Sequence, residues 1–313
     1  MTSVPVFAAR DVEAAVSPER AVEVVRDAFV AYARGEWSMP SKVYVPAYPA
    51  GDFRAMPALG AGFALLKWVT SFPRNPEVGL PTVTGLVLLS DASNGMPVAV
   101  LDAGAVTALR TGAAAVLAAE VLGRPDAETA AVIGAGVNGR AVARTFLARG
   151  RRVSLWDVDP GRAEAAADEL GSEVAESAEA ALGADLVATV TPGHELVYAE
   201  GSLGAGQHVS LMGADGPGKA EIAVEELARV RVFCDDWEQA SHNGDLVHAV
   251  EAGVVGRADV VQLGDVLAGT APGRLSPDDT TVFDSTGLAI QDLAVAGAAF
   301  ERAGDLDLSA LEL

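Results

Sequence analysis

A glycine-rich turn between an apolar run and a helical pattern carries the clearest chemistry in the sequence. Residues 134–139 read Gly-Ala-Gly-Val-Asn-Gly, directly after the β-prone run 130–133 and before a helical periodicity over 140–149. In such a turn the first glycine allows a sharp bend, the second lets a pyrophosphate approach, and the third lets helix and strand pack closely. We therefore predict a dinucleotide-binding turn. Its predicted cofactor contacts are Gly134, Gly136, Val137, Asn138 and Gly139.

An acid follows at the end of the next apolar run. Asp157 lies eighteen residues after Gly139, where a carboxylate bonds the ribose hydroxyls of an adenosine. Its charge would repel a 2′-phosphate, so we expect NAD rather than NADP, although the nearby Arg162 leaves NADP open.

A set of cations precedes the turn. The 22 basic residues include only three lysines, Lys42, Lys67 and Lys219. A partly buried lysine can release a proton near neutral pH, whereas arginine cannot, so scarce lysines are expected where that chemistry is needed. Arg54 and Arg110 offer planar forks that match a carboxylate. Lys42, Arg54, Lys67 and Arg110, which all precede the turn, predict a small anionic substrate; the alternative is that Arg54 or Arg110 only neutralises neighbouring acids.

Polar residues follow the predicted strands of the second half. Asp215 lies in loop 213–219, which is too rich in glycine and proline for a helix. An acid at a strand end can act as a base toward an amine or water; alternatively, Asp215 caps a helix that starts near Glu221. Lys219 can meet cofactor phosphate or ribose. Thr191 and Ser285 also follow predicted strands, where ligands of parallel sheets dock.

Two other classes of site find little support. The four histidines, His194, His208, His242 and His248, form no metal-binding pair, and a solvated acidic helix start explains the cluster 235–242. We therefore expect no metal. No G-x-S-x-G occurs, which excludes a serine nucleophile elbow.

The elements that must position these residues fall into two groups. Apolar spacing predicts a helix over 18–34, then short strands interrupted by proline and glycine, and a long alanine-rich helix over 103–122. The predicted strands of this first group are 42–45, 53–57, 63–69, 82–90 and 96–102, with a hairpin turn at 91–95. The second group alternates strands and helices, and a last helix over 288–303 is expected to pack back on the first domain.

Composition limits the setting. The 313 residues carry a formal net charge of −21 and one cysteine, Cys234, which argues against nucleic acid partners and disulfides. No apolar run reaches the about 18 residues of a membrane span, so we expect a cytoplasmic protein. The acidic, lysine-poor composition reflects either GC-rich coding or adaptation to salt.

Together these segments resemble the ornithine cyclodeaminase and mu-crystallin family, and within it the archaeal-type alanine dehydrogenases. The resemblance rests on segments 39–44, 51–57, 67–69, 79–82, 109–113, 134–139, 213–219 and 284–287. It implies an α/β fold: a Rossmann-type NAD-binding domain at 113–291, and a smaller α/β substrate-binding and dimerisation domain at 1–112 plus 292–313. It also implies a homodimer formed through the N-terminal sheets.

The resemblance also implies roles for individual residues. Lys67 and Asp215 match catalytic positions, and Lys42 and Arg110 match positions that bind the substrate carboxylate. Cofactor contacts are implied for Thr82, Thr111, Asp157, Lys219 and Ser285. Ornithine cyclodeaminases carry a glutamate where this chain has Arg54; the arginine would repel a diamine and suits a short oxo acid such as pyruvate.

We therefore predict an NAD-dependent oxidoreductase that interconverts a small L-amino acid, alanine favoured, with its 2-oxo acid and ammonia through an imino acid. The alternatives are an ornithine cyclodeaminase or a reductase of cyclic imines such as pyrroline-2-carboxylate. A non-catalytic ligand-binding protein of the mu-crystallin kind is a second alternative, against which Lys67 and Asp215 argue.

Overall fold

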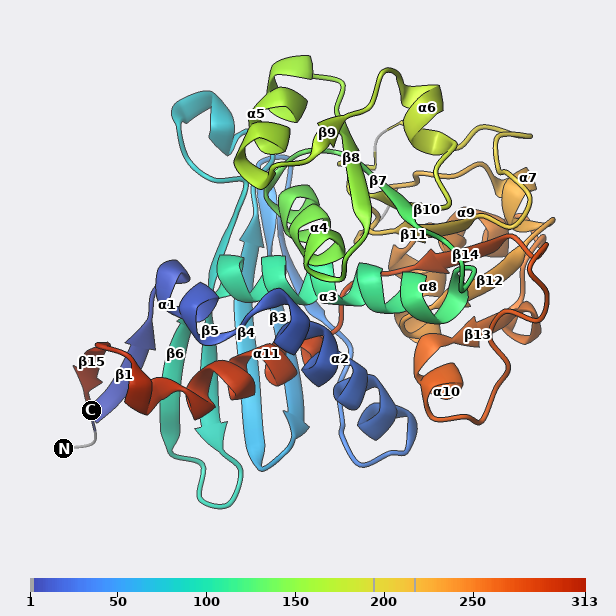
Figure 1. Cartoon of the computed structure of the whole chain (residues 1–313). Coiled ribbons are helices and arrows are strands. Elements are labelled where there is room, and N and C mark those ends of the chain that lie inside the picture. The colour runs from blue at the N-terminus through green and yellow to red at the C-terminus, as the bar shows by residue number, and fades with distance from the viewer. Residues whose placement is uncertain (1–2, 194, 217) are drawn as a thin grey trace. The chain divides into compact units, whose positions relative to one another are not determined.

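The chain folds into two compact units, each an α/β structure (Figure 1). The computed structural model describes residues 3–193, 195–216 and 218–313. The first unit contains the chain up to Arg110 and again from Leu288 onward, and the second contains Thr111–Gly287. The predicted fold class is confirmed.

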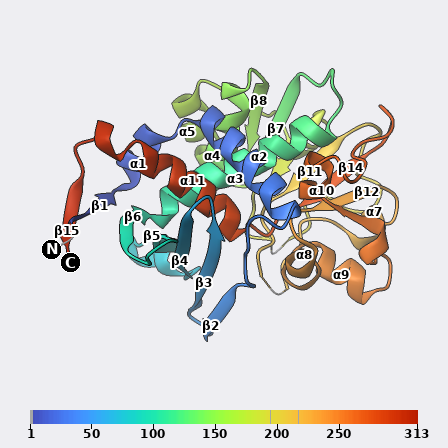
Figure 2. The same cartoon turned by 90° about the horizontal axis from the view of Figure 1, so that it is seen from below.

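The first unit is built on a seven-stranded mixed sheet. Its strand order is β15-β1-β6-β5-β4-β3-β2, in which β1 runs parallel to β6 and all other neighbours are antiparallel. The strands are β1 (Ser3–Phe7), β2 (Val43–Ala47), β3 (Gly51–Gly60), β4 (Phe63–Ser71), β5 (Val83–Asp91), β6 (Pro97–Asp102) and β15 (Ser309–Glu312). The predicted strands from β2 to β6 and the β5–β6 hairpin are confirmed. The strand β1 and the edge strand β15, which lie side by side in Figure 2, were not predicted.

The two faces of this sheet differ sharply, because successive side chains of a strand point to opposite sides. On β4, Leu65, Lys67 and Val69 are buried, whereas Leu66 and Trp68 are exposed. The buried side is here called the inner face. It is covered by α11 (Ala289–Glu301), against which α2 (Pro18–Ala33) packs (Figure 1). Ser17 caps α2 and Pro18 occupies its first turn, as the sequence predicted. Helix α1 (Ala9–Ala15) precedes α2.

The second unit is an eight-stranded parallel sheet of the Rossmann type. Its order is β13-β12-β14-β11-β10-β7-β8-β9. The strands are β7 (Thr129–Ile133), β8 (Arg152–Trp156), β9 (Glu173–Val174), β10 (Leu186–Thr189), β11 (His208–Leu211), β12 (Arg231–Cys234), β13 (Val260–Gln262) and β14 (Thr281–Asp284). The connecting helices include α4 (Val137–Ala148), α5 (Pro160–Leu170), α6 (Ala178–Leu182), α7 (Val224–Leu227), α8 (Trp237–Asn243), α9 (Leu246–Glu251) and α10 (Leu263–Leu267). The strand order reverses between β7 and β10, which is where doubly wound sheets bind ligands at their carboxyl ends.

One expectation about apolar runs needs correcting. Helix α3 (Ala103–Leu122) has 20 residues and a mean hydropathy of 1.5, so it is long and apolar enough to cross a membrane by length and composition. Polar residues such as Arg110 interrupt this segment, so the sequence shows no unbroken apolar run of that length. Of its most apolar window, 72% is buried inside the protein, as in the core helix of a globular domain.

A buried histidine joins two central strands of the second unit. His208 on β11 pairs in register with Thr281 on β14, and its Nδ1 lies 2.9 Å from the Thr281 hydroxyl. Its Nε2 lies 3.0 Å from the Ser210 hydroxyl. Burial lowers the pKa of His208 to about 3, and the charge of Arg274 contributes. The folded protein therefore holds this imidazole neutral.

This histidine predicts a loss of stability in acid. Between pH 7 and 5 the unfolded chain binds a proton at residue 208 that the folded chain refuses, so the free energy of unfolding falls as pH falls. We expect the wild type to lose about 2 kcal/mol more than His208→Gln over this range. Urea unfolding at both pH values measures the difference, with the exposed His242→Gln as control. Equal losses in wild type and His208→Gln would contradict the assignment.

Candidate functional site

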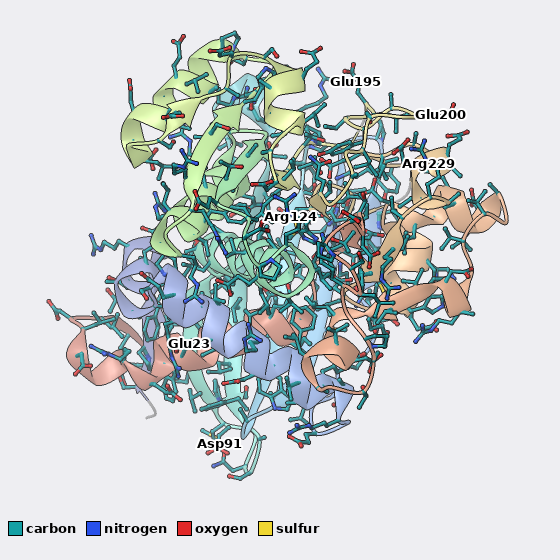
Figure 3. All side chains as sticks on the ribbon, turned by 45° about the vertical axis from the view of Figure 1, so that its right-hand side comes forward. Glu23, Asp91, Arg124, Glu195, Glu200 and Arg229 are labelled. Atoms are coloured by element: carbon teal, nitrogen blue, oxygen red, sulfur yellow. The ribbon has the colours of Figure 1, made fainter. Side chains whose placement is uncertain are left out.

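Most charged side chains of the protein lie at its surface, as Glu195, Glu200 and Arg229 do (Figure 3). Burying an ionised group is costly unless it is paired and hydrogen-bonded. The charged residues that the fold nevertheless buries are therefore the natural place to look for a site. In both units they gather around the residues that the sequence singled out.

The glycine turn has the geometry of a phosphate cradle. Gly134 has φ +101°, and a Cβ there would lie 2.5 Å from the Val190 carbonyl oxygen; a Cβ on Gly139 would lie 1.7 Å from the Gly134 oxygen. A Cβ on Gly136 would meet nothing within 4 Å. Gly136 also precedes α4 without a side-chain cap, which leaves amides of the first turn to bind an anion. The turn thus fits a dinucleotide pyrophosphate.

Asp157 ends β8 beside this turn. The side chain is 7% exposed; its Oδ2 accepts from the Ala135 amide at 2.8 Å, and its Oδ1 accepts from the Asp159 amide at 2.9 Å. Arg162 lies 3.6 Å away and is half exposed. The carboxylate therefore ties the strand end to the turn. Its oxygens can accept further hydrogen bonds besides these two.

Hydroxyl groups line the strand ends of the same unit. Thr191 follows β10, and both its amide and its hydroxyl donate to Glu221 Oε1, at 2.9 and 2.6 Å. Ser285 follows β14, and its hydroxyl donates to Asp235 at 3.2 Å. Thr111 Oγ1 is buried and has no hydrogen-bond partner among the described residues. An orphaned hydroxyl of this kind fits the predicted cofactor contact.

A buried glutamate connects two of these strand ends. Glu221 is fully buried, and its Oε2 accepts from the Thr189 hydroxyl at 2.6 Å and from the Gly213 amide at 2.9 Å. Together with its bonds to Thr191, this carboxylate joins the loops after β10 and β11. Burial and the Glu221 charge raise the pKa of the adjacent Asp245 to about 8.

The acidic stretch before α8 differs from its prediction. Asp235 and Asp236 are 2% and 7% exposed, so this is not a solvated helix start. Asp236 does cap α8 through the Gln239 amide. Asp235 instead accepts from the loop after β14, including the Gly287 amide at 2.8 Å. It orders the loop that carries Ser285.

Asp215 and Lys219 form an ion pair with Nζ and Oδ1 2.7 Å apart. Both side chains are partly exposed, at 37% and 25%. No helix starts at Glu221: α7 begins at Val224 with Ala223 as its N-cap. The alternative that Asp215 caps such a helix is therefore wrong. The pair holds a carboxylate and an ammonium at the carboxyl end of β11.

Three of the predicted cations gather on or beside the inner face of the first unit. Lys67 is 2% exposed, and its Nζ donates to Asp292 Oδ1 at 2.9 Å and to Thr107 Oγ1 at 2.6 Å. Arg110 Nε lies 3.6 Å from the same Asp292 oxygen. Burial lowers the pKa of Lys67 to about 8, with the charges of Arg110 and Arg54 acting in the same direction and Asp292 opposing them. A lysine so poised can exchange a proton near neutral pH.

Arg54 lies on the inner face of β3 but is not a solitary cation. Its Nε donates to Asp52 Oδ1 at 2.6 Å and its Nη2 to Asp52 Oδ2 at 3.3 Å. The guanidinium also lies 5.4 Å from the Tyr44 ring centre. Lys42 and Thr82 directly precede β2 and β5 and are half-buried. Asp52 therefore neutralises much of the positive charge assumed for this part of the site.

The sequence analysis assigned no role in the site to four acids of these networks: Asp52, Glu221, Asp235 and Asp292. A signal existed for Asp292, because it is the one charged residue in the apolar run 288–300 and a buried acid requires a partner. The partners of Glu221 and Asp235 come from distant strand ends and had no local signal.

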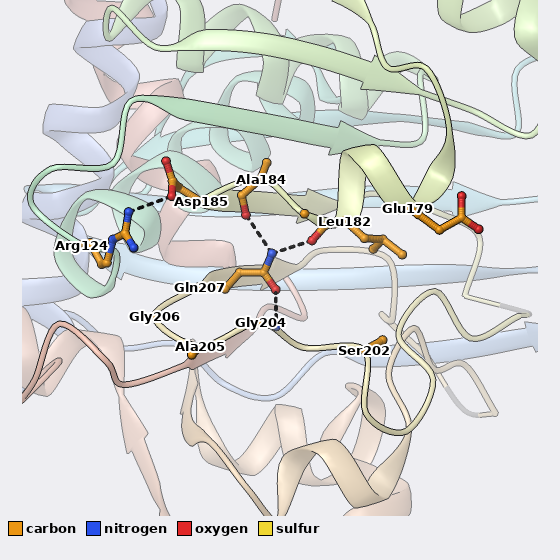
Figure 4. Close-up of a pocket in the computed structure, with 11 residues that line it drawn as sticks. Arg124, Glu179, Leu182, Ala184, Asp185, Ser202, Gly204, Ala205, Gly206 and Gln207 are labelled. Atoms are coloured by element: carbon orange, nitrogen blue, oxygen red, sulfur yellow. Dashed lines mark hydrogen bonds and ion pairs between the residues drawn. The ribbon is translucent and has the colours of Figure 1, made fainter.

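A cavity of about 370 Å³ lies elsewhere in the second unit (Figure 4). It is lined by Arg124, Asp185 and Gln207 among others, at the amino ends of β10 and β11. Gln207 is held by the Ala184 carbonyl, and Arg124 pairs with Asp185 at 2.9 Å. Parallel sheets bind ligands at the opposite, carboxyl ends. In the part of the chain that the structure describes, which omits His194, no three His, Cys, Asp or Glu side chains could hold a metal ion.

Residues 4–306 match the model of the ornithine cyclodeaminase/mu-crystallin family. The chain belongs to this family. The ornithine cyclodeaminase/mu-crystallin relatives include an alanine dehydrogenase of Archaeoglobus fulgidus, 42% identical over 94% of this chain and 93% of that protein.

Solved structures of this family are also similar. An archaeal alanine dehydrogenase dimer with bound NAD superposes with a TM-score of 0.93 and 39% identity, covering 99% of each chain. The Δ1-pyrroline-2-carboxylate reductase of Thermococcus litoralis, in complex with NADH and L-proline, gives a TM-score of 0.90 at 27% identity, covering 96% and 98%. Relatives thus include both a dehydrogenase and a reductase.

The glycine turn offers a matched pair of substitutions. Gly136→Ala adds a methyl group that meets no protein atom at an ordinary φ of −72°, so we expect a folded protein with NADH affinity at least about tenfold weaker. Gly139→Ala drives the same group into the Gly134 carbonyl and should lower thermal stability. Melting curves and NADH fluorescence titrations measure both effects. Wild-type affinity in Gly136→Ala would contradict a pyrophosphate at this turn.

Proposed function

We propose that this protein is an NAD-dependent amino acid dehydrogenase that interconverts a small L-amino acid, alanine favoured, with its 2-oxo acid and ammonia. The observation that carries the proposal is Lys67, a buried lysine whose Nζ is hydrogen-bonded to Asp292 and Thr107 and whose pKa is lowered by burial to about 8. The similarity to an alanine dehydrogenase over nearly the whole chain supports the same reaction.

In this reaction each group of residues has a separate proposed role. Lys42, Arg54 and Arg110 bind the substrate carboxylate. Bound NAD supplies a hydride acceptor for the α-carbon. Lys67 and Asp215 would take the proton released from the amine, and would carry protons to and from the water that adds to the imino acid and the ammonia that leaves.

The second unit holds the cofactor. The amides at the start of α4 receive the pyrophosphate, and Asp157 receives the adenosine ribose. Thr111, Thr191, Lys219 and Ser285 complete the proposed contacts in this unit, and Thr82 of the first unit is a further proposed contact. Support comes from the open space at Gly136 and the orphaned Thr111 hydroxyl. Two solved relatives contain NAD or NADH.

A cyclic-imine reductase or cyclodeaminase is the second candidate, and one observation favours it. Arg54 is paired with Asp52 through two hydrogen bonds, so its repulsion of a diamine or of a positively charged imine is smaller than an isolated arginine would exert. A reductase of pyrroline-2-carboxylate is also among the similar structures.

A panel of substrates separates the two candidates. We expect NADH oxidation with pyruvate only when ammonium is present, and slower turnover of pyrroline-2-carboxylate. L-Ornithine with NAD should release no ammonia. Turnover of the cyclic imine or of ornithine with none of pyruvate would overturn the dehydrogenase assignment.

Lys67→Arg tests the proton-transfer role. The substitution keeps the positive charge but removes a proton that can leave near neutral pH. We expect turnover to fall by about 10²- to 10⁴-fold, with NADH affinity unchanged. Steady-state kinetics and NADH titration, with a melting curve to verify folding, measure the change. Wild-type turnover in a folded Lys67→Arg protein would remove this lysine from the chemistry.

We further infer that the protein forms a homodimer through the outer face of the first unit's sheet. Leu66 pairs across the strands with Leu88, and Trp68 with Leu86, and all four are 39–59% exposed. Contiguous exposed apolar residues of this kind mark an interaction surface. The similar alanine dehydrogenase is a dimer.

A charge in this patch should prevent association. Leu86→Arg would bury an unpaired cation in the dimer, so we expect a monomer by light scattering. Leu275→Arg is the matched control, because Leu275 is 67% exposed and lies in the second unit. A Leu86→Arg dimer as stable as the wild type would exclude this face.

A further inference from the structure

Asp292 is an unusual residue in its helix. Helix α11 covers the inner face of the first unit, and the only other acid in it, Glu301, is 67% exposed at its end. Asp292 is fully buried. The cost of burying this carboxylate must be offset by what it contacts.

The contacts of Asp292 come from two elements, β4 and α3. Its Oδ1 accepts from Lys67 Nζ on β4 at 2.9 Å and lies 3.6 Å from Arg110 Nε on α3. Lys67 Nζ also donates to Thr107 Oγ1, whose own proton goes to the Ala103 carbonyl at 2.6 Å. Two of the three N–H bonds of the ammonium are thereby given fixed directions.

The charges around Lys67 explain why the carboxylate is needed. Arg110 on α3 and Arg54 on β3 both disfavour a protonated Lys67, as does burial, and Asp292 opposes all three. Asp52, a buried acid on β3, is already bonded to Arg54. Asp292 is therefore the counter-ion that keeps Lys67 able to hold a proton.

We propose that Asp292 is the positioning residue of the catalytic lysine: it fixes the direction and the protonation of Lys67 and holds the Arg110 guanidinium beside it. The inference rests on the proposed function of Lys67. It adds a residue of the last helix to the machinery of the site.

Because the chain has only three lysines, the titration of Lys67 can be followed directly by NMR. Protein labelled with ¹³Cε-lysine should show three lysine signals, assigned with Lys42→Arg and Lys219→Arg. In the wild type Lys67 should titrate near pH 8. In Asp292→Asn the midpoint should fall by at least about one pH unit, because an anion that favours the charged form is gone. Glu301→Gln, which removes an exposed acid from the same helix, should leave it unchanged.

Kinetics add a second readout. If Lys67 donates a proton during amination of the oxo acid, the alkaline limb of the kcat/KM profile should move to lower pH in Asp292→Asn by the same amount as the NMR midpoint. The KM for the oxo acid should rise as Arg110 loses its anchor, and NADH affinity should stay the same. A Lys67 midpoint at the wild-type value in folded Asp292→Asn would overturn the proposal.

Asp292→Glu covers the case in which the asparagine variant does not fold. It keeps the charge but moves it by one methylene, so Lys67 should still titrate near pH 8 while turnover falls about 10- to 100-fold through misplacement of Nζ. Wild-type turnover in Asp292→Glu would refute the positioning role. The NMR midpoint reports on Asp292 even if Lys67 has no catalytic role, so this failure is distinct from failure of the proposed function.

Discussion

Buried carboxylates hold together the loops at the carboxyl edge of the second unit's sheet. A carboxylate removed from water keeps its charge only if several donors replace its hydration. Glu221 meets this condition by accepting from Thr189, Thr191 and Gly213. The donors that offset the cost of burying the charge are thereby held in fixed positions, and so are the loops that carry them, which have no regular structure of their own.

The first unit also buries charged groups that need partners, but there the groups that must be paired are cations. The sequence presents cations and suggests an open anion site, but the structure supplies two acids, Asp52 and Asp292, that hold the guanidinium and ammonium groups. Each acid lowers the positive charge offered to a substrate. Recognition of a carboxylate therefore depends on the directions of the donors as well as on the total charge.

Much of the architecture was accessible from local sequence patterns. The glycine turn, the cap of α2 and the alanine-rich α3 depend on neighbours in the chain, and the structure has them where the patterns indicate. The strands β1 and β15 were missed; they pair with each other from near the two ends of the chain, a contact between distant segments that no local pattern encodes. The parallel order of β12, β13 and β14 depends on packing between distant segments, which no local pattern encodes.

The candidate site shows the same division. Lys67 and Arg54 stand out by residue type and spacing, but their partners do not. Asp292 is 225 residues away from Lys67, and Asp235 is 52 residues from the loop that it orders. Only tertiary structure brings such pairs together, and the sequence indicates at most that a buried acid needs a partner.

The return of the chain to the first unit has a consequence for biosynthesis. Residues up to Arg110 leave the ribosome first, but α11 and β15 belong to the same unit and are made last, after the whole of Thr111–Gly287. Until then the inner face of the sheet lacks its cover and Lys67 lacks its counter-ion. Translation that stops early therefore leaves an incomplete first unit in which Lys67 lacks Asp292, so only a chain synthesised through α11 can assemble this buried ion pair.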